Sequence, residues 1–202
     1  RRNIRVVIDI PSCGAYDLFM NHPEFFVKDE AGQPIIPLDW TDVRILKTEE
    51  RHRLYEDVYN EHKKFVDMVL SLGADGIRAD VATIRPYGFW KNLIEYTRSK
   101  DKEFMFLAEA SNAWVEAPSK FAPFTTWDKL LHAGFDGYYG DYFNLKDWKT
   151  SKEFFRSVLH NYRLHLAQKK SVIGSFTTHD ETSPILLKGA DFSKMIIWLN
   201  ST

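Results

Sequence analysis

Short apolar runs recur along this chain and are separated by stretches with helical spacing. Val6 to Ile10 is apolar except for Asp9, which is typical of a strand buried on both faces. Gly76 to Asp80, Phe104 to Glu109 and Ser171 to Phe176 are further runs of this kind. The pattern predicts a set of buried, parallel strands.

Helices are predicted between these strands. From Glu49 to Leu72 apolar residues recur every three or four positions, and Gly73 follows as a left-handed stop. Phe89 to Arg98 has the same spacing. Thr150-x-x-Glu153 is a capping box that opens another helix. Strand and helix therefore alternate, which predicts an α/β fold with a parallel sheet, either open and doubly wound or closed into a barrel.

Two long stretches interrupt the alternation. Residues 11–48 are rich in Pro, Gly, Asp and Asn, so we expect a short inserted excursion from the core there. Ser111 to Trp148 is also irregular, with a predicted short helix at Trp127 to Ala133 and a strand near Phe135 to Tyr139. Each stretch directly follows a predicted strand. In α/β folds, the loops that follow strands often carry the functional residues.

Polar residues at the ends of the strands favour the barrel. Asp9, Asp80, Glu109 and the pair His179-Asp180 all lie at or just past the carboxyl end of a predicted strand. That edge is the active-site face of a (β/α)₈ barrel.

Composition narrows the range of partners. The 202 residues carry a formal net charge of −1 without basic clusters, so no nucleic-acid partner is expected. No apolar run reaches the ~20 residues that span a bilayer, and no signal peptide opens the chain, so no membrane partner is expected either. The lone Cys13 favours a reducing, cytoplasmic compartment. Since the chain opens beside a strand and stops inside an apolar helix, we expect both ends to be cut from a longer protein.

Two carboxyl groups carry the candidate chemistry. Hydrolysis of a glycosidic bond with retention needs a nucleophilic carboxylate and a protonated carboxyl, and Asp80 and Glu109 fit these roles. Arg78 lies two residues before Asp80, on the same side of a strand, where its charge favours the ionised nucleophile. Glu109 has no cation beside it in the sequence, so we expect it to hold the proton.

These segments resemble the alpha-amylase superfamily. Gly76-Ile-Arg-Ala-Asp-Val-Ala82 is similar to its nucleophile strand, and Phe106-Leu-Ala-Glu109 to its acid/base strand. Phe176-Thr-Thr-His-Asp-Glu181 resembles its His-Asp segment, and Trp40-Thr-Asp-Val-x-x-Leu46 its inserted domain. The resemblance implies a partial (β/α)₈ barrel, running from about the third strand to the seventh across residues 1–202.

The resemblance also implies roles for single residues. Asp80 would be the nucleophile, Glu109 the acid/base and Asp180 the residue that stabilises the transition state. The resemblance implies a sugar contact for His179, and Trp40 is a loop aromatic that could stack on a sugar ring. The candidates for binding an α-linked carbohydrate substrate are Arg78, His179, Asp9 and Trp40. The implied activity is hydrolysis or transfer at α-glucosidic bonds of α-glucans or oligosaccharides.

Departures from the family pattern concern calcium and substrate contacts. The family's calcium ligands correspond to Cys13 and Ile45, which offer no oxygen ligand, so we expect no calcium and no other cofactor. The family's Asn and His after the first strand read Cys13-Gly14, and the Lys-His after the nucleophile reads Thr83-Ile84. No histidine pair has metal-ligand spacing with a third ligand, so no metal site is predicted.

Several alternatives stay open at this stage. A buried ion pair would account for Arg78 and Asp80 without catalysis. The missing first-motif histidine also suits a catalytically impaired, carbohydrate-binding relative of the same fold. Hydrolysis and glycosyl transfer are not separated, the oligomeric state is open, and a barrel that lacks strands is expected to be inactive alone.

Overall fold

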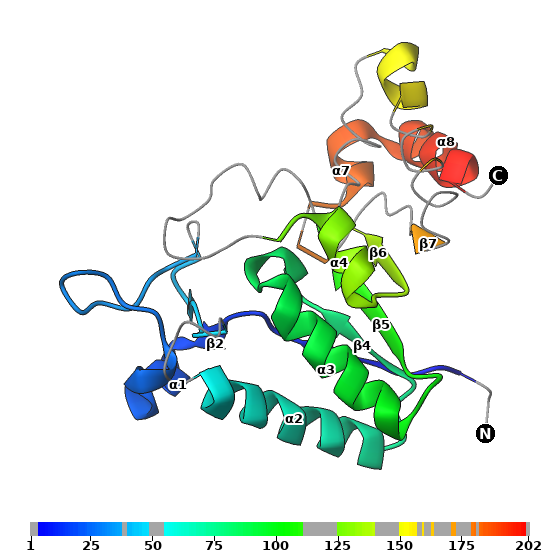
Figure 1. Cartoon of the computed structure of the whole chain (residues 1–202). Coiled ribbons are helices and arrows are strands. Elements are labelled where there is room, and N and C mark those ends of the chain that lie inside the picture. The colour runs from blue at the N-terminus through cyan, green and yellow to red at the C-terminus, as the bar shows by residue number, and fades with distance from the viewer. Residues whose placement is uncertain are drawn as a thin grey trace. The chain divides into compact units, whose positions relative to one another are not determined.

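The structure is a computed structural model that describes residues 4–37, 40–48, 55–110, 125–139, 150–156, 159, 163, 171–172, 179–180 and 182–200. The chain divides into two compact units, Arg1–Asp136 and Gly137–Thr202, and each is described by itself. Figure 1 labels most of the elements named below.

Three parallel strands form the sheet of the first unit. The strand β4 (Gly76–Ala79) lies between β1 (Val7–Ile10) and β5 (Met105–Glu109) and pairs with both. The register places Asp9 opposite Arg78, so the carboxyl ends of the three strands meet at one edge. The predicted strands and their parallel pairing are confirmed, with ends that differ by one or two residues.

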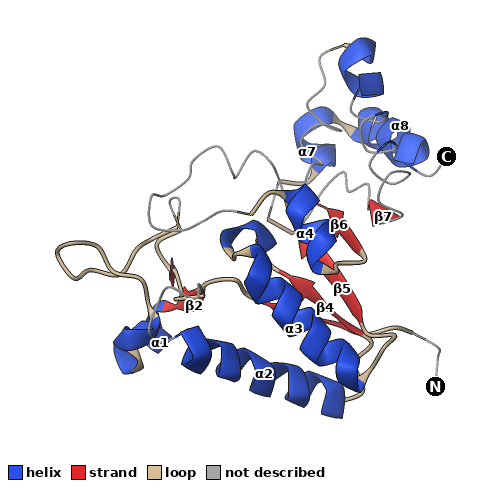
Figure 2. Cartoon of the chain, in the orientation of Figure 1, coloured by secondary structure: helices blue, strands red, loops and turns tan. Residues whose placement is uncertain are grey.

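Two long helices connect these strands and lie side by side along the sheet (Figure 2). They are α2 (Tyr55–Ser71) and α3 (Tyr87–Lys100). Val58, Val66 and Val69 form the buried stripe of α2, whereas Met68 and Leu72, which the spacing predicts on the same face, are exposed. The buried side chains of α3 are Phe89, Trp90, Leu93, Ile94 and Thr97.

Glycines in the left-handed region follow two helices. Gly73, with a φ of 74°, lies just beyond α2 as predicted, and Gly134, with a φ of 114°, caps α4 (Trp127–Ala133). An L side chain at either position would be strained, so the two turns favour glycine. The bounds of α4 are those that the sequence predicted.

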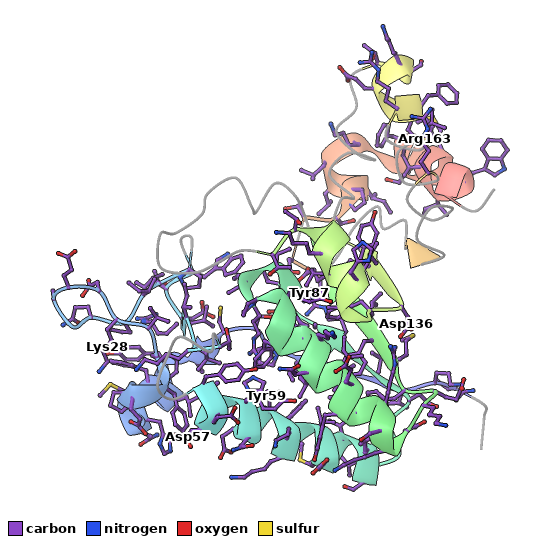
Figure 3. The ribbon with its side chains drawn as sticks, in the orientation of Figure 1. Lys28, Asp57, Tyr59, Tyr87, Asp136 and Arg163 are labelled. Atoms are coloured by element: carbon purple, nitrogen blue, oxygen red, sulfur yellow. The ribbon has the colours of Figure 1, made fainter. Side chains whose placement is uncertain are left out.

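The amino-terminal side of the sheet is held by Asp136, which Figure 3 labels. Its Oδ2 accepts a 2.8 Å hydrogen bond from the backbone N–H of Phe106 and a 2.7 Å bond from Nη2 of Arg98. In barrel folds this edge contributes stability, and the opposite edge carries the chemistry.

The excursion after β1 has secondary structure of its own. The strands β2 (Gly14–Ala15) and β3 (Val43–Arg44) pair antiparallel, and α1 (Tyr16–Asn21) and the 3₁₀ helix η1 (Pro23–Phe25) lie between them. Sequence periodicity indicated only an irregular loop here, because elements of two to six residues are too short to show a period. Phe26 is fully buried against Leu46 and Val58, which ties the excursion to α2.

The second unit contains two short parallel strands and the carboxyl-terminal helices. They are β6 (Gly137–Tyr139), β7 (Ser171–Val172), α7 (Pro184–Lys188) and α8 (Ala190–Asn200). The predicted capping box is confirmed, because Thr150 N–H donates to the Glu153 carboxylate at 3.3 Å and Glu153 N–H donates to Thr150 Oγ1 at 3.2 Å. Residues 173–176 of the last predicted strand lie outside the described residues. None of the described helices has the length and apolar character needed to cross a membrane.

Close contact between β4 and β5 generates a stability prediction. A Cβ atom on Gly76 would lie 2.7 Å from the carbonyl oxygen of Met105, so we expect Gly76→Ala to lower the free energy of unfolding by about 1–3 kcal/mol. A Cβ atom on Gly88 in α3 would meet nothing within 4 Å, and Gly88→Ala should raise that free energy by up to about 1 kcal/mol. Urea unfolding of both variants measures the two shifts, and equal shifts would contradict the packing argument.

Candidate active site

The strand register brings three acidic residues to the carboxyl edge of the sheet. Asp9 lies in β1 opposite Arg78 of β4, and Glu109 is the last residue of β5. Asp80 directly follows β4, where its backbone N–H donates to the carbonyl of Ile10 at 3.0 Å. Because these neighbouring parallel strands end at the same edge of the sheet, the side chains of Asp9, Asp80 and Glu109 lie close together.

The guanidinium of Arg78 joins all three carboxyls. Its Nη1 donates to Asp9 Oδ1 at 2.7 Å and to Asp80 Oδ1 at 2.6 Å, and its Nη2 forms an ion pair with Glu109 Oε2 at 2.8 Å. The Arg78 side chain is 12% exposed. One largely buried cation thus faces three acidic groups, which cannot all be ionised without strong mutual repulsion.

The carboxyls of Asp80 and Glu109 differ in how deeply they are buried. The side chain of Asp80 is 36% exposed, whereas that of Glu109 is 4% exposed. Burial is the largest cause that raises the pKa of Glu109 to about 7, and the charge and hydrogen bond of Asp80 raise it further. The N–H of Val81 and the Arg78 cation act in the opposite direction. At neutral pH Glu109 can therefore hold or release a proton.

The physical reason why Glu109, and not Asp80, holds the proton differs from the reason that the sequence suggested. The sequence predicts that Glu109 holds a proton because no cation lies beside it along the chain, yet Arg78 reaches it across the sheet. Desolvation outweighs that contact, so the assignment of Glu109 as the proton holder stays and its physical cause changes.

The residue after Asp80 has an unusual backbone. Val81 has φ 39° and ψ 52°, a left-handed conformation that β-branched residues rarely adopt. It precedes the 3₁₀ helix η2 (Ala82–Ile84), and its N–H donates to Glu109 Oε2 at 3.0 Å. The turn that follows the strand end of Asp80 is therefore bonded directly to Glu109.

A second buried arginine, which the sequence analysis did not single out, supports these loops. Arg85 is fully buried, and it donates to the carbonyls of Pro11 at 2.7 Å and Ser12 at 3.1 Å, thus joining the loops after β1 and β4. Burial lowers its pKa to about 9, so it remains charged at neutral pH. Its guanidinium also lies 4.6 Å from the ring centre of Phe89. The sequence signal for it was an arginine among apolar residues just before Pro86.

His62 completes the surroundings of Arg85. Its Nε2 lies 2.6 Å from Arg85 Nη1 and its Nδ1 lies 2.7 Å from the carbonyl of Val58. These partners require an Nδ1–H tautomer whose Nε2 accepts from the arginine. Burial, followed by the Arg85 charge, lowers the pKa of His62 well below its usual value, so the ring is neutral.

Trp40 and Cys13 pack beside the turn at Val81. Val81 forms a buried cluster with Cys13 and Ile84, and Trp40 is partly buried against this cluster. Burial raises the pKa of the Cys13 thiol to about 12, so it is protonated at neutral pH. Ile45 is buried with Val27 in a separate apolar cluster. Among the described residues, no group of three or more His, Cys, Asp or Glu side chains is arranged to hold a metal ion.

The remaining predicted residues, His179 and Asp180, belong to the second unit. Nε2 of His179 lies 3.3 Å from Oδ1 of Asp180, and both side chains are more than half exposed. Of the seven predicted site residues, the first unit brings together Asp9, Arg78, Asp80 and Glu109, and it places Trp40 beside the turn that follows. A shared site with His179 and Asp180 stays a prediction.

Comparison with known proteins gives one curated relative and several structural ones. The sequence matches no family model. It is 25% identical over 134 residues to an alpha-1,4-glucan:maltose-1-phosphate maltosyltransferase from Arcanobacterium haemolyticum, a match that covers 66% of this chain and 17% of that protein.

Among solved structures, an alpha-amylase from Lactobacillus plantarum matches 98% of this chain with a TM-score of 0.79 at 24% identity. A maltogenic alpha-amylase from Thermotoga neapolitana matches 89% of it with a TM-score of 0.59 at 21% identity. This chain covers 48% and 39% of those two chains. The chain therefore has the fold of alpha-amylases, and its parallel sheet fits part of a (β/α)₈ barrel.

The raised pKa of Glu109 predicts how stability depends on pH. Between pH 4.5 and about 7 the unfolded chain carries the carboxylate while the folded chain holds the proton. The free energy of unfolding should therefore fall as pH rises through this window, by up to about 1.4 kcal/mol per pH unit. Urea unfolding of the wild type and of Glu109→Gln at several pH values measures this slope, which the Gln variant should lack. Identical slopes would show that Glu109 titrates normally.

Proposed function

We propose that this chain is part of the catalytic barrel of a retaining glycoside hydrolase or transglycosylase that acts on α-glucosidic bonds. The observation that carries the proposal is the single Arg78 guanidinium that binds Asp80 and Glu109, of which one is accessible and the other buried. Enzymes of this class need one ionised and one protonated carboxyl at the same bond. Burial and charge provide that difference here.

In the first half-reaction, the Asp80 carboxylate attacks the anomeric carbon of the substrate. The bond from that carbon to the glycosidic oxygen breaks, and Glu109 donates its proton to this oxygen, which leaves as an alcohol. Arg78 then stabilises the carboxylate that forms on Glu109, since it lies 2.8 Å from Oε2. The product of this step is a glycosyl ester of Asp80.

In the second half-reaction, Glu109 takes a proton from water or from a sugar hydroxyl. The oxygen of that acceptor bonds to the anomeric carbon while the ester bond to Asp80 breaks, so the configuration is retained. A pKa near 7 suits a group that acts first as an acid and then as a base. Contact of both carboxyls with the one guanidinium of Arg78, at 2.6 Å for Asp80 and 2.8 Å for Glu109, supports retention, because an inverting enzyme must leave room for a water between its carboxyls.

The other predicted residues extend this proposal. Asp180 would stabilise the transition state, and His179, Asp9 and Trp40 would contact the sugar. Residues 11–48 would be the inserted excursion after the third strand of the barrel, in a chain that reaches the seventh. For Asp9, its 56% exposed side chain beside Arg78 leaves an oxygen for a substrate hydroxyl.

The substrate class follows from the relatives. An alpha-amylase from Geobacillus thermoleovorans was solved with acarbose and a pullulanase from Anoxybacillus with maltotriose. The curated relative is named as a maltosyltransferase. We infer an α-linked oligosaccharide substrate, with water or a sugar hydroxyl as the acceptor.

Substitution of Asp80 or Glu109 in the full-length protein should impair turnover to different extents. We expect Asp80→Asn to abolish turnover of α-glucans, and Glu109→Gln to slow it by roughly 10²–10⁴. An α-glucosyl fluoride needs no proton on its leaving group, so the first half-reaction of Glu109→Gln on it should be much less affected. Initial rates on both substrates test this, and Glu103→Gln, an exposed carboxyl on the same segment, serves as the control. Normal turnover by Asp80→Asn would refute the proposal.

The anomeric form of the first product provides an independent test. We expect proton NMR during early turnover to show the α-anomer, because two displacements at the anomeric carbon restore its configuration. A β-anomeric first product would overturn the retaining mechanism. Oligosaccharide binding without turnover by the wild type would instead establish the catalytically impaired relative.

A further inference from the structure

The two oxygens of Glu109 are not equivalent. Oε2 accepts the N–H of Val81 at 3.0 Å and lies 2.8 Å from Nη2 of Arg78. A carboxyl oxygen that accepts an N–H and lies beside a guanidinium is a poor place for a proton, because a hydroxyl hydrogen there would compete with the N–H and would face a positive charge. The structure thus distinguishes an accepting oxygen, Oε2, from the other oxygen, Oε1.

The contact to Val81 depends on a strained backbone. Val81 has a φ of 39°. Among the described residues, all others with a positive φ are glycines. Such a conformation persists in a β-branched residue only where the surroundings impose it. Its side chain is buried against Cys13 and Ile84, and Trp40 packs against the same cluster. The apolar cluster therefore fixes the turn, and the turn directs the N–H toward Glu109.

We propose that Val81 is a positioning residue, which holds its backbone N–H on Oε2 of Glu109 and so assigns the transferable proton to Oε1. The inference rests on the proposed function of Glu109 and adds the atom from which the proton leaves. In the first half-reaction the proton moves from Oε1 to the glycosidic oxygen as the bond to the anomeric carbon breaks. In the second, Oε1 takes a proton from the incoming hydroxyl.

Removal of the single N–H tests this assignment. Replacing Val81 in the full-length protein by the corresponding α-hydroxy acid turns its amide into an ester and leaves the side chain in place. The N–H bond favours the ionised form of Glu109, so its loss should raise the pKa of Glu109 above about 7. For a bond to a charged group we expect a shift of about one pH unit or more.

Two readouts separate the failure of this inference from the failure of the proposed function. Carbon-13 NMR of the Glu109 carboxyl follows the titration without substrate, and the alkaline limb of the pH profile of kcat/KM follows it during turnover. Among the described residues, Arg78 and Asp80 are the charged groups that act on Glu109, Asp9 contacts Arg78, and none of these three is altered. Absence of turnover in the wild type would reject the enzyme, while the NMR titration would still test Val81.

A matched control uses the neighbouring turn. The N–H of Ile84 donates to the carbonyl of Val81 at 3.0 Å, so an ester at position 84 removes a nearby backbone bond without touching Glu109. We expect this variant to lose stability and to keep the wild-type titration. An unchanged titration in the ester at position 81, or an equal shift in both esters, would overturn the inference.

A second series tests the strain itself. Val81→Ala and Val81→Gly remove most of the side chain, but only glycine adopts a positive φ without cost. Glycine is usually less stabilising than alanine, so a higher urea midpoint for Val81→Gly than for Val81→Ala would confirm a backbone held against its preference. The usual order, with alanine the more stable, would contradict it.

Discussion

The contact between Arg78 and three carboxyls is the interaction on which the rest of the site depends. Three parallel strands that end at one edge bring Asp9, Asp80 and Glu109 within reach of one guanidinium. Without the cation, the acidic groups would repel one another in a partly buried place. With it, differences in burial decide which group holds the proton. The same cation therefore neutralises both Asp80 and Glu109, and their unequal burial makes Glu109 the one with the raised pKa.

The loops that surround this site are held by buried polar groups as well as by apolar packing. Arg85 donates to the carbonyls of Pro11 and Ser12, and no carboxylate is its direct hydrogen-bond partner among the described residues. A buried cation of this kind is costly unless its donors are used, and its Nη1 is directed at the neutral ring of His62. The loops after the strands are therefore held in place only while Arg85 is charged and His62 is neutral, and neither residue is one of the three clustered carboxyls.

Much of this architecture could be predicted from the sequence, because it follows from local patterns. The strand around Arg78, the helix α4 and the capping box at Thr150 each have a period, a cap or a turn residue that identifies them. The contact of Arg78 with Asp80 also follows from a spacing of two in a strand. The contact with Glu109 does not, since it joins residues 31 positions apart and depends on how β4 and β5 align.

The left-handed turn at Val81, which escaped prediction, has no local signature. A left-handed valine cannot be inferred from Val81 alone, because its intrinsic preference points away from that conformation and only the packing of Cys13, Ile84 and Trp40 imposes it. Backbone strain clusters at functional sites, and here the strained residue donates its N–H to Glu109. Conflict between local preference and tertiary structure is therefore informative in itself. In the mechanism that we propose, the turn after Asp80 is therefore the place where backbone strain orients the acid.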